Sequence, residues 1–283
     1  MKLFKIETGN FKLDGGALFG VVPKSIWQKI YPADENNLCN ICMRCLLIEV
    51  ENRLILIDCG MGNTMPESLL KYYFTNGSDS LINSLAQNGF TPNDITDVVF
   101  SHLHFDHCGG AITKMGENNF ELTFKNAQYW IGKSHWESAL QPNRREKASF
   151  LSQNINPLQA SNKLTLIDTD TEIAPGVNLT LYNGHTKGQI VPIITYNDKV
   201  IAFCADLIPT AAHIPISFVC GYDINPVITM LETESFLQTA LENNYTLFFE
   251  HDLQIECCDL QQTNKGVAIK NTYTLNDFTK KNY

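Results

Sequence analysis

Long apolar runs are absent from this sequence of 283 residues. No stretch of roughly 18 apolar residues occurs, so we expect no membrane-spanning helix and no membrane partner. The first residues, Met1 to Glu7, contain no apolar core of the kind found in secretory signal peptides, which leads us to expect a cytoplasmic protein. Charged residues make up only 18%, and the net charge of −9 argues against a nucleic-acid partner, because an acidic chain repels phosphate backbones.

Linkers are absent as well. No Pro-, Gly- or Ser-rich stretch and no low-complexity tract divides the chain, and 44% of its residues are hydrophobic. A chain of this length can bury about 75% of the surface that its unfolded form exposes. We therefore predict a single domain over residues 1–283.

The nine cysteines are an odd number in a long chain without a secretion signal, so we expect reduced thiols. Cys39, Cys42 and Cys45 form a C-x-x-C-x-x-C run, which leaves a metal cluster open as a minor alternative. No fourth cysteine or Cys/His pair follows at the usual spacing, and the run leads directly into an apolar strand. We interpret these residues as buried or half-buried thiols.

Two segments, residues 45–58 and 191–206, share one pattern. Each has two apolar, β-branched runs around a short polar turn, which predicts a β-hairpin, and each second run ends on an aspartate, Asp58 or Asp206. Two such hairpins indicate two sheets that are built alike and pack face to face.

Helical patterns lie outside these strands. Residues 80–88 and 229–243 carry apolar residues at helical spacing, and Ser134 to Glu137 has the pattern of a capping box that opens a helix toward Phe150. Helices outside and two mixed sheets inside give an α/β protein of αββα sandwich type.

The strongest chemical signal is an H-x-H-x-D-H run, which directly follows a predicted strand at residues 96–100. His102 and His104 are two apart on an extended chain and point the same way, so they can bind one metal ion. Asp106 and His107 follow as the chain turns and can face a second ion. We expect Gly109 and Gly110 to allow a tight turn here. Histidine and aspartate without cysteine suit Zn²⁺, with Fe²⁺ or Mn²⁺ as alternatives.

Further ligands are expected at the ends of other strands. His185, Asp206 and His251 each follow an apolar strand, where site residues carried by loops are commonly found. A structural histidine or a solvated aspartate is the alternative for each.

Together these residues resemble the metallo-β-lactamase superfamily. The resemblance rests on the His102–His107 run, the Gly184-His185-Thr186 turn, Asp206 at a strand end and His251 near the C-terminus. It implies the αββα sandwich and two metal ions, most simply two Zn²⁺ per chain. It implies His102, His104 and His185 on one ion, Asp106, His107 and His251 on the other, and Asp206 between them. Asp58 resembles the family's carboxylate that orients a ligand histidine.

Such a site is expected to hydrolyse a small ester or lactone with hydroxide formed from metal-coordinated water. Asp106 is a candidate catalytic proton carrier as well as a ligand. The segments Asp14–Gly20 and Ala205–Pro209 resemble the branch that holds N-acyl homoserine lactone lactonases and methyl-parathion-hydrolase-like enzymes. We therefore expect a zinc-dependent lactonase of the quorum-quenching type, and assembly as a homodimer is left open.

Other functions remain as alternatives. A phosphotriesterase or arylesterase of the methyl-parathion-hydrolase type is the nearest, followed by a non-catalytic metal or redox protein. A zinc β-lactamase, an RNA-processing nuclease and a glyoxalase-type thioesterase are disfavoured. The first lacks an export signal, the second would sit poorly with the acidic charge, and the third would need a convincing basic cluster near the C-terminus.

The N-terminal segment, residues 1–40, is a candidate wall for an acyl-chain pocket. Its apolar residues are Phe19, Val21, Val22, Ile26 and Trp27, and core packing is the equal alternative. Several lactonases of this branch resemble one another in carrying a tyrosine three residues after the bridging aspartate. Here Pro209 stands there without a side-chain donor. His213, seven residues past Asp206, is the candidate catalytic substitute.

Overall fold

Two β-hairpins organise the part of the chain that the computed structural model describes, residues 1–280. They consist of strands β2 and β3 and of strands β11 and β12, which are Leu38–Val50, Arg53–Ile57, Gln189–Tyr196 and Lys199–Phe203. Both pairs are antiparallel, and each turn contains a residue with positive φ, Glu51 at 51° and Asn197 at 57°. Both predicted hairpins are confirmed.

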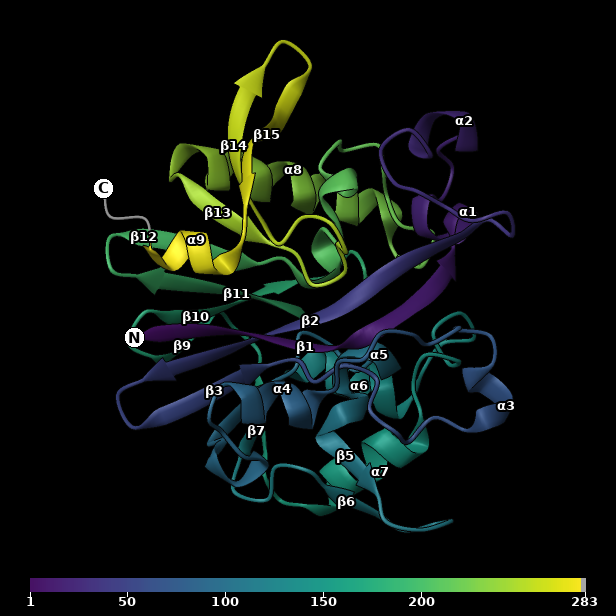
Figure 1. The fold of residues 1–283 in the computed structure, drawn as a ribbon, viewed down its shortest axis with the longest axis vertical. Coiled ribbons are helices and arrows are strands. Elements are labelled where there is room, and N and C mark those ends of the chain that lie inside the picture. The colour runs from purple at the N-terminus through teal and green to yellow at the C-terminus, as the bar shows by residue number, and fades with distance from the viewer. Residues whose placement is uncertain (281–283) are drawn as a thin grey trace.

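Each hairpin lies in its own sheet, and the two sheets face each other (Figure 1). The first sheet has the order β1-β2-β3-β4-β7-β8, and the second has the order β15-β14-β13-β12-β11-β10-β9. The remaining strands of the first sheet are β1, β4, β7 and β8, at Lys2–Asp14, Asp97–Val99, Gln128–Gly132 and Leu164–Ile167. Those of the second are β9, β10, β13, β14 and β15, at Thr171–Ala174, Val177–Tyr182, Tyr245–Phe248, Cys257–Thr263 and Gly266–Tyr273. A small extra pair consists of β5 and β6, at Ile112–Lys114 and Phe120–Leu122.

The strands bury both of their faces, because apolar residues occupy odd and even positions alike. In β3, Ile55 and Ile57 point into the core between the sheets, whereas Leu56 points to the outer face. In β12, Ile201 and Phe203 enter the same central core while Ala202 faces outward. Sheets of this kind need a helical layer on both sides.

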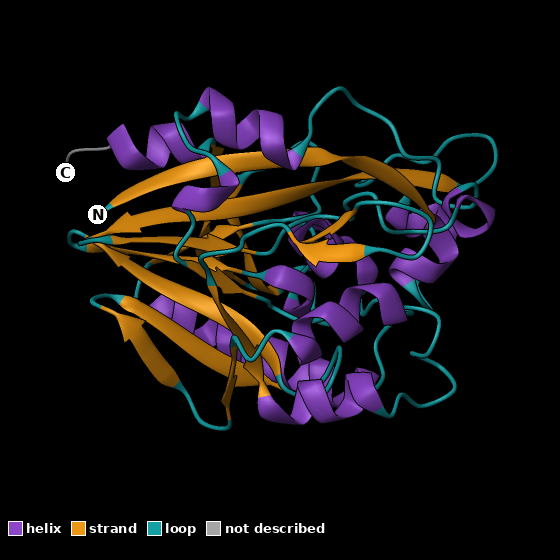
Figure 2. Cartoon of the chain, turned by 90° about the horizontal axis from the view of Figure 1, so that it is seen from below, coloured by secondary structure: helices purple, strands orange, loops and turns teal. Residues whose placement is uncertain are grey.

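Helices supply those outer layers (Figure 2). Helices α4, α5, α6 and α7 lie on the side of the first sheet, at Leu81–Gln87, Phe105–Cys108, Lys133–Leu140 and Ser152–Ala160, and α8 at Pro226–Glu242 lies on the second sheet (Figure 1). Short helices α1, α2, α3 and α9 are at Gly15–Phe19, Lys24–Trp27, Glu67–Leu70 and Leu275–Lys280. No helix within residues 1–280 is long and apolar enough to cross a membrane. The αββα sandwich is therefore confirmed.

The helix ends agree only in part with the sequence patterns. Ser80 caps α4 by accepting a hydrogen bond from the Asn83 amide, as the pattern predicts. The capping box at Ser134 is wrong, because α6 begins at Lys133 and its N-cap residue is Gly132, which has no side chain. Helix α6 also stops at Leu140, well short of Phe150, and Pro142 follows two residues later.

Five strands end at one edge of the sandwich and lead into polar residues. Strands β3 and β4 run parallel, as do β12 and β13, and β10 has the direction of β12 because both pair antiparallel with β11. The residues that follow these strands are Asp58, His102, His185, Asp206 and His251. The topology thus gathers residues from across the chain at a single edge.

Two glycines allow backbone segments to cross tightly at this edge. A Cβ on Gly109 would lie 2.0 Å from the carbonyl oxygen of Met61, and one on Gly110 would lie 2.0 Å from that of Cys59. The chain does turn tightly here, in the short 3-10 helix η2 at Gly109–Ala111, but neither glycine has a positive φ. What requires glycine is the close approach of two backbones.

We predict that Gly109→Ala lowers the free energy of unfolding by about 1–3 kcal/mol, because the new methyl group must displace backbone. Urea unfolding of both proteins measures this difference. Gly116→Ala is the control, since a Cβ there meets its nearest neighbour, Asn119 Cβ, at 3.9 Å. The control should stay within about 0.5 kcal/mol of wild type. Equal effects of the two substitutions would contradict the packing argument.

Candidate metal centre

Two groups of side chains meet at this edge, and the ligand atoms within each lie within 4.8 Å of one another. The first contains His102, His104, His185 and Asp206, and the second contains Asp106, His107 and His251. The structure therefore brings together all seven residues that the sequence analysis selected as metal ligands.

The first group has the spacing of a metal coordination shell. His104 Nδ1 lies 2.9 Å from His102 Nε2 and 3.3 Å from His185 Nε2. His185 Nε2 also lies 3.1 Å from Asp206 Oδ2. Ligand atoms at about 2.0–2.1 Å from a tetrahedral zinc ion stand about 3.3 Å apart, so these separations suit one cation.

The second group is similar, and Asp206 reaches both. His107 Nε2 lies 3.1 Å from His251 Nε2, and Asp106 Oδ2 is 3.6 Å and 3.8 Å from these two atoms. Asp206 directs Oδ2 toward His185 at 3.1 Å and Oδ1 toward His251 at 3.1 Å. Its two oxygens thus face different groups.

Buried polar side-chain atoms at the candidate centre lack hydrogen-bond partners within the described residues. Asp206 Oδ1 is buried and accepts no hydrogen bond from the described residues, although it lies among imidazole nitrogens. Burial and the neighbouring His107 hold the pKa of His102 well below its usual range, so this ring is a neutral donor of its lone pair. A buried carboxylate and converging imidazoles are donor groups that divalent metal cations bind.

Three of the candidate ligand histidines have their outward nitrogens held by hydrogen-bonding groups. His107 Nδ1 lies 3.1 Å from Asp58 Oδ2, His185 Nδ1 lies 2.8 Å from Asp223 Oδ1, and His251 Nδ1 lies 2.8 Å from the Cys42 carbonyl oxygen. Such partners fix the orientation and tautomer of the ring. Asp58 takes the place that the resemblance implied, whereas the sequence analysis missed Asp223.

A second carboxylate, that of Glu250, lies beside His107. Its Oε2 is 3.0 Å from His107 Nδ1, close to Asp58, and the whole side chain is buried. Burial raises the pKa of Glu250 to about 8, despite the opposing attraction of His107. A carboxyl group whose neutral form is favoured by burial can lie beside this nitrogen together with Asp58 at a lower electrostatic cost than a second carboxylate.

His135 connects the two ligand-bearing loops. Its Nε2 accepts a hydrogen bond of 2.8 Å from the Leu103 amide, and its Nδ1 lies 3.2 Å from the Lys187 carbonyl oxygen. Burial and the nearby His104 lower the pKa of His135 to about 3, which keeps Nε2 free to accept. The sequence offered no signal for this role, since the partners are 32 and 52 positions away.

Glu146 stands beside the first group. Its Oε1 accepts a 2.6 Å hydrogen bond from Thr186 and lies 3.7 Å from His104 Nε2. Although burial acts in the other direction, the hydrogen bonds and His104 lower the pKa of Glu146 to about 2. It comes from the loop after α6, which the sequence patterns assigned to a helix.

A cavity of about 250 Å³ opens onto these residues. Its polar floor is formed by His104, Asp106, His185, Asp206 and His251, and one wall is apolar, formed by Phe11, Leu13, Leu18 and Ile41. The N-terminal segment therefore contributes, but with residues other than those expected. Phe19 and Trp27 are buried and stacked with ring centroids 4.9 Å apart, whereas Val21 is 95% exposed.

His213 does not line this cavity, and its ring is fully engaged. Nε2 lies 2.9 Å from the Leu18 carbonyl oxygen, Nδ1 lies 2.8 Å from Thr210 Oγ1, and the ring stacks on Phe19 at a centroid distance of 4.8 Å. A carbonyl oxygen can only accept, so Nε2 carries the proton. No N–H remains for a substrate, and the geometry corrects the expected oxyanion role to a structural one.

The cysteine run does not converge on one point. Cys39, Cys42 and Cys45 are buried in β2, and Cys42 has the opposite position parity, so it points to the other face of the strand. All nine cysteines are free and buried, and none joins a group of candidate metal ligands within residues 1–280. The interpretation as buried thiols agrees with this arrangement.

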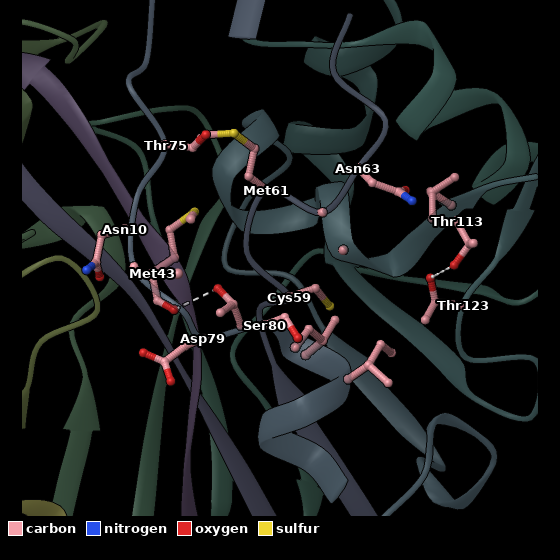
Figure 3. A pocket seen from close by; sticks show the side chains of 18 of the residues that line it. Asn10, Met43, Cys59, Met61, Asn63, Thr75, Asp79, Ser80, Thr113 and Thr123 are labelled. Atoms are coloured by element: carbon pink, nitrogen blue, oxygen red, sulfur yellow. Dashed lines mark hydrogen bonds between the residues drawn. The ribbon is translucent and has the colours of Figure 1, made fainter. Parts of the chain in front are cut away.

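A larger cavity of about 500 Å³ is lined by the loop that carries Cys59 and Met61 (Figure 3). Asn10, Met43 and Asp79 are among its lining residues. None of the seven candidate ligands lines it. Although this cavity is larger, it is therefore not the candidate catalytic site.

Comparison with known proteins agrees with the fold and the ligand pattern. The model of the metallo-beta-lactamase superfamily matches residues 44–251, which is most of the chain. The chain belongs to the metallo-β-lactamase superfamily. An N-acyl homoserine lactonase of Bacillus thuringiensis is 27% identical over an alignment of 270 residues, which covers 90% of this chain and 94% of that protein.

Solved structures give the same family. A probable metal-dependent hydrolase from Staphylococcus aureus superposes with a TM-score of 0.88 at 30% identity, over 96% of both chains. A dizinc quorum-quenching lactonase superposes with a TM-score of 0.79 at 23% identity, over 96% of this chain and 95% of that one. The second similarity shows the fold. As a member of this superfamily with lactonase relatives, the protein is a metal-dependent hydrolase.

We predict that His213→Ala lowers the free energy of unfolding by about 1–3 kcal/mol, because the Leu18 carbonyl and the Thr210 hydroxyl lose their partner. The kcat of the metal-loaded enzyme should stay of the same order as wild type. His213→Gln retains an amide donor and should recover part of the stability. A large loss of kcat at unchanged stability would restore the catalytic role of His213.

Proposed function

We propose that this protein is a dinuclear zinc hydrolase that opens the lactone ring of N-acyl homoserine lactones, with residues 1–40 helping to wall the substrate cavity. One observation carries the proposal: two ligand groups share Asp206 on the floor of a cavity with one apolar wall. The similarity to curated N-acyl homoserine lactonases supports the choice of substrate.

In this proposal the residues hold two ions. His102, His104 and His185 hold the first, Asp106, His107 and His251 hold the second, and Asp206 bridges them. When bound, the ions would supply a water molecule of lowered pKa and positive charge that stabilises the developing oxyanion. Residues of the chain orient the substrate and transfer the proton.

The cavity walls orient the substrate. Phe11, Leu13 and Leu18 present an apolar surface for the acyl chain, and the lactone head lies over the polar floor. Asp106 is both a proposed ligand and a lining residue, so its carboxylate is placed to pass a proton to the leaving alkoxide as the ring opens. Asp58 and Asp223 hold the ligand rings in place during this transfer.

We predict a stoichiometry near two zinc ions per chain, because seven ligands exceed what one ion needs. Asp206→Ala should lower both zinc content and activity, as measured by elemental analysis and steady-state kinetics. Asp198→Ala, at an exposed hairpin turn, is the matched control and should keep both. Fully active wild type with a single zinc ion would exclude the two-ion site.

We also predict that the zinc-loaded enzyme hydrolyses N-acyl homoserine lactones. If the apolar wall holds the acyl chain, each methylene buried there adds about 0.8 kcal/mol, or about fourfold in kcat/KM, until the wall is filled. Lactone opening can be followed by proton release across a series of chain lengths. Efficient turnover of a phosphotriester or a thioester without measurable lactone turnover would favour the alternative functions.

A further inference from the structure

The cavity over the candidate metal centre contains few side-chain hydrogen-bond donors apart from the ligand histidines. The described residues that line it offer Tyr73, Arg145, Ser149 and Tyr222. Arg145 already donates to the Gly221 carbonyl oxygen. Pro209, three residues after Asp206, also lines the cavity and has no side-chain donor. The hydrogen bond of Arg145 uses one of the five N–H groups of its guanidinium, and Tyr73, Ser149 and Tyr222 offer a hydroxyl group each.

The backbone is held by hydrogen bonds on both sides of Tyr222. On one side, the Gly221 amide donates to the Ala17 carbonyl oxygen at 2.8 Å, and a Cβ on Gly221 would lie only 2.6 Å from that oxygen. On the other side, Asp223 binds His185 Nδ1 at 2.8 Å, and the Ile224 amide donates to the His185 carbonyl oxygen at 3.0 Å. The residue thus lies between a contact with α1 and a double contact with a proposed ligand.

The side chain of Tyr222 is 40% exposed and faces the cavity, and within the described residues its hydroxyl makes no hydrogen bond. A phenol on this anchored backbone extends farther than the short side chain of Ser149. Tyr73 has the same phenol, but its ring packs against Phe105 at a centroid distance of 4.7 Å and against Phe11 at 6.2 Å. Tyr73 therefore serves as part of the wall.

We propose that Tyr222 is a catalytic residue whose hydroxyl donates a hydrogen bond to the carbonyl oxygen of the scissile ester. The inference rests on the proposed hydrolytic function and names a residue of the same site. As hydroxide adds to the carbonyl carbon, the C=O electron pair moves onto oxygen and the hydrogen bond from Tyr222 strengthens. The proton remains on the tyrosine, and the pair returns to the carbonyl when the ring C–O bond breaks and the leaving alkoxide takes a proton.

The test compares Tyr222→Phe with Tyr72→Phe in the zinc-loaded enzyme, since each variant removes one hydroxyl and keeps its ring. Tyr72 is exposed and does not line the cavity. A donor that acts mainly in the transition state affects kcat more than KM. We expect Tyr222→Phe to lower kcat about tenfold, with KM, zinc content and melting temperature close to wild type. Tyr72→Phe should keep a kcat near wild type.

A second substrate locates the hydrogen bond. N-hexanoyl homoserine lactone has both an amide and a lactone carbonyl, whereas a γ-alkyl butyrolactone has only the latter. The loss of kcat in Tyr222→Phe should be similar on both substrates. A loss that disappears on the alkyl lactone would assign the hydroxyl to the amide and overturn the proposal, as would an unchanged kcat or an effect confined to KM.

Failure of this inference can be told apart from failure of the proposed function. The same assays report whether the wild type opens lactones at all. If it does not but hydrolyses an aryl ester, the lactonase proposal is wrong, and the two variants are then compared on that ester. A tenfold loss of kcat confined to Tyr222→Phe would still support the donor, and equal rates in both variants would overturn it.

Discussion

The candidate metal centre depends on the contacts of Asp206. Its Oδ2 lies 3.1 Å from His185 and its Oδ1 lies 3.1 Å from His251, and these histidines belong to different groups of candidate ligands. The sequence reaches this arrangement through a strained backbone: Ala205, the residue before Asp206, has a φ of 44°, which side chains other than glycine rarely adopt. Neighbouring hydrogen bonds stabilise this strained backbone conformation. The Cys204 amide donates to the Phe248 carbonyl oxygen at 3.0 Å, and Gln189, with its amide oriented to satisfy both groups, accepts from the Asp206 and Leu207 amides at 2.9 Å. In the other hairpin Asp58 itself has a φ of 57°, so both hairpins leave their second strand through a left-handed residue and turn a carboxylate toward the centre.

The sequence analysis correctly predicted the features that depend on residues close together in the chain. The hairpins, the cap at Ser80 and the clustering of His102 through His107 depend on local spacing, and the structure agrees with them. The contacts of Asp223, Glu146 and His135 could not be predicted in this way, because each joins loops that only the tertiary fold brings together. The failed capping box at Ser134 has a similar cause. A Cβ on Gly132 would lie 2.1 Å from the Gly188 carbonyl oxygen, so packing between two loops fixes the residue that precedes α6.

The size and hydrophobicity of a residue in the N-terminal segment do not predict whether it lines the cavity. Phe19 and Trp27 are large apolar residues that the fold buries, but Phe11 has the same side chain as Phe19 and is equally buried. Of these three residues only Phe11 lines the cavity, together with Leu13. Both lie on β1, and their positions in the sequence differ by two, as expected for one face of a strand. An apolar wall on a strand keeps a fixed shape, whereas a wall on a loop would adapt to different acyl chains.

The proline at position 209 also has a structural explanation. Its carbonyl oxygen accepts a hydrogen bond of 3.2 Å from the His251 amide, and two residues later the Ala211 amide donates to Asp252 Oδ2 at 3.0 Å. The segment after Asp206 is thereby held against the segment that carries His251, and the fixed φ of proline reduces the conformational freedom lost in forming this contact. His213 continues the same line of contacts, since burial keeps its pKa below the usual value and its neutral ring donates to the Leu18 carbonyl behind the cavity wall. The segment from Asp206 to His213 therefore connects Asp206, the candidate ligand His251 and the apolar wall, and a rigid residue at position 209 serves that connection better than a flexible side chain would.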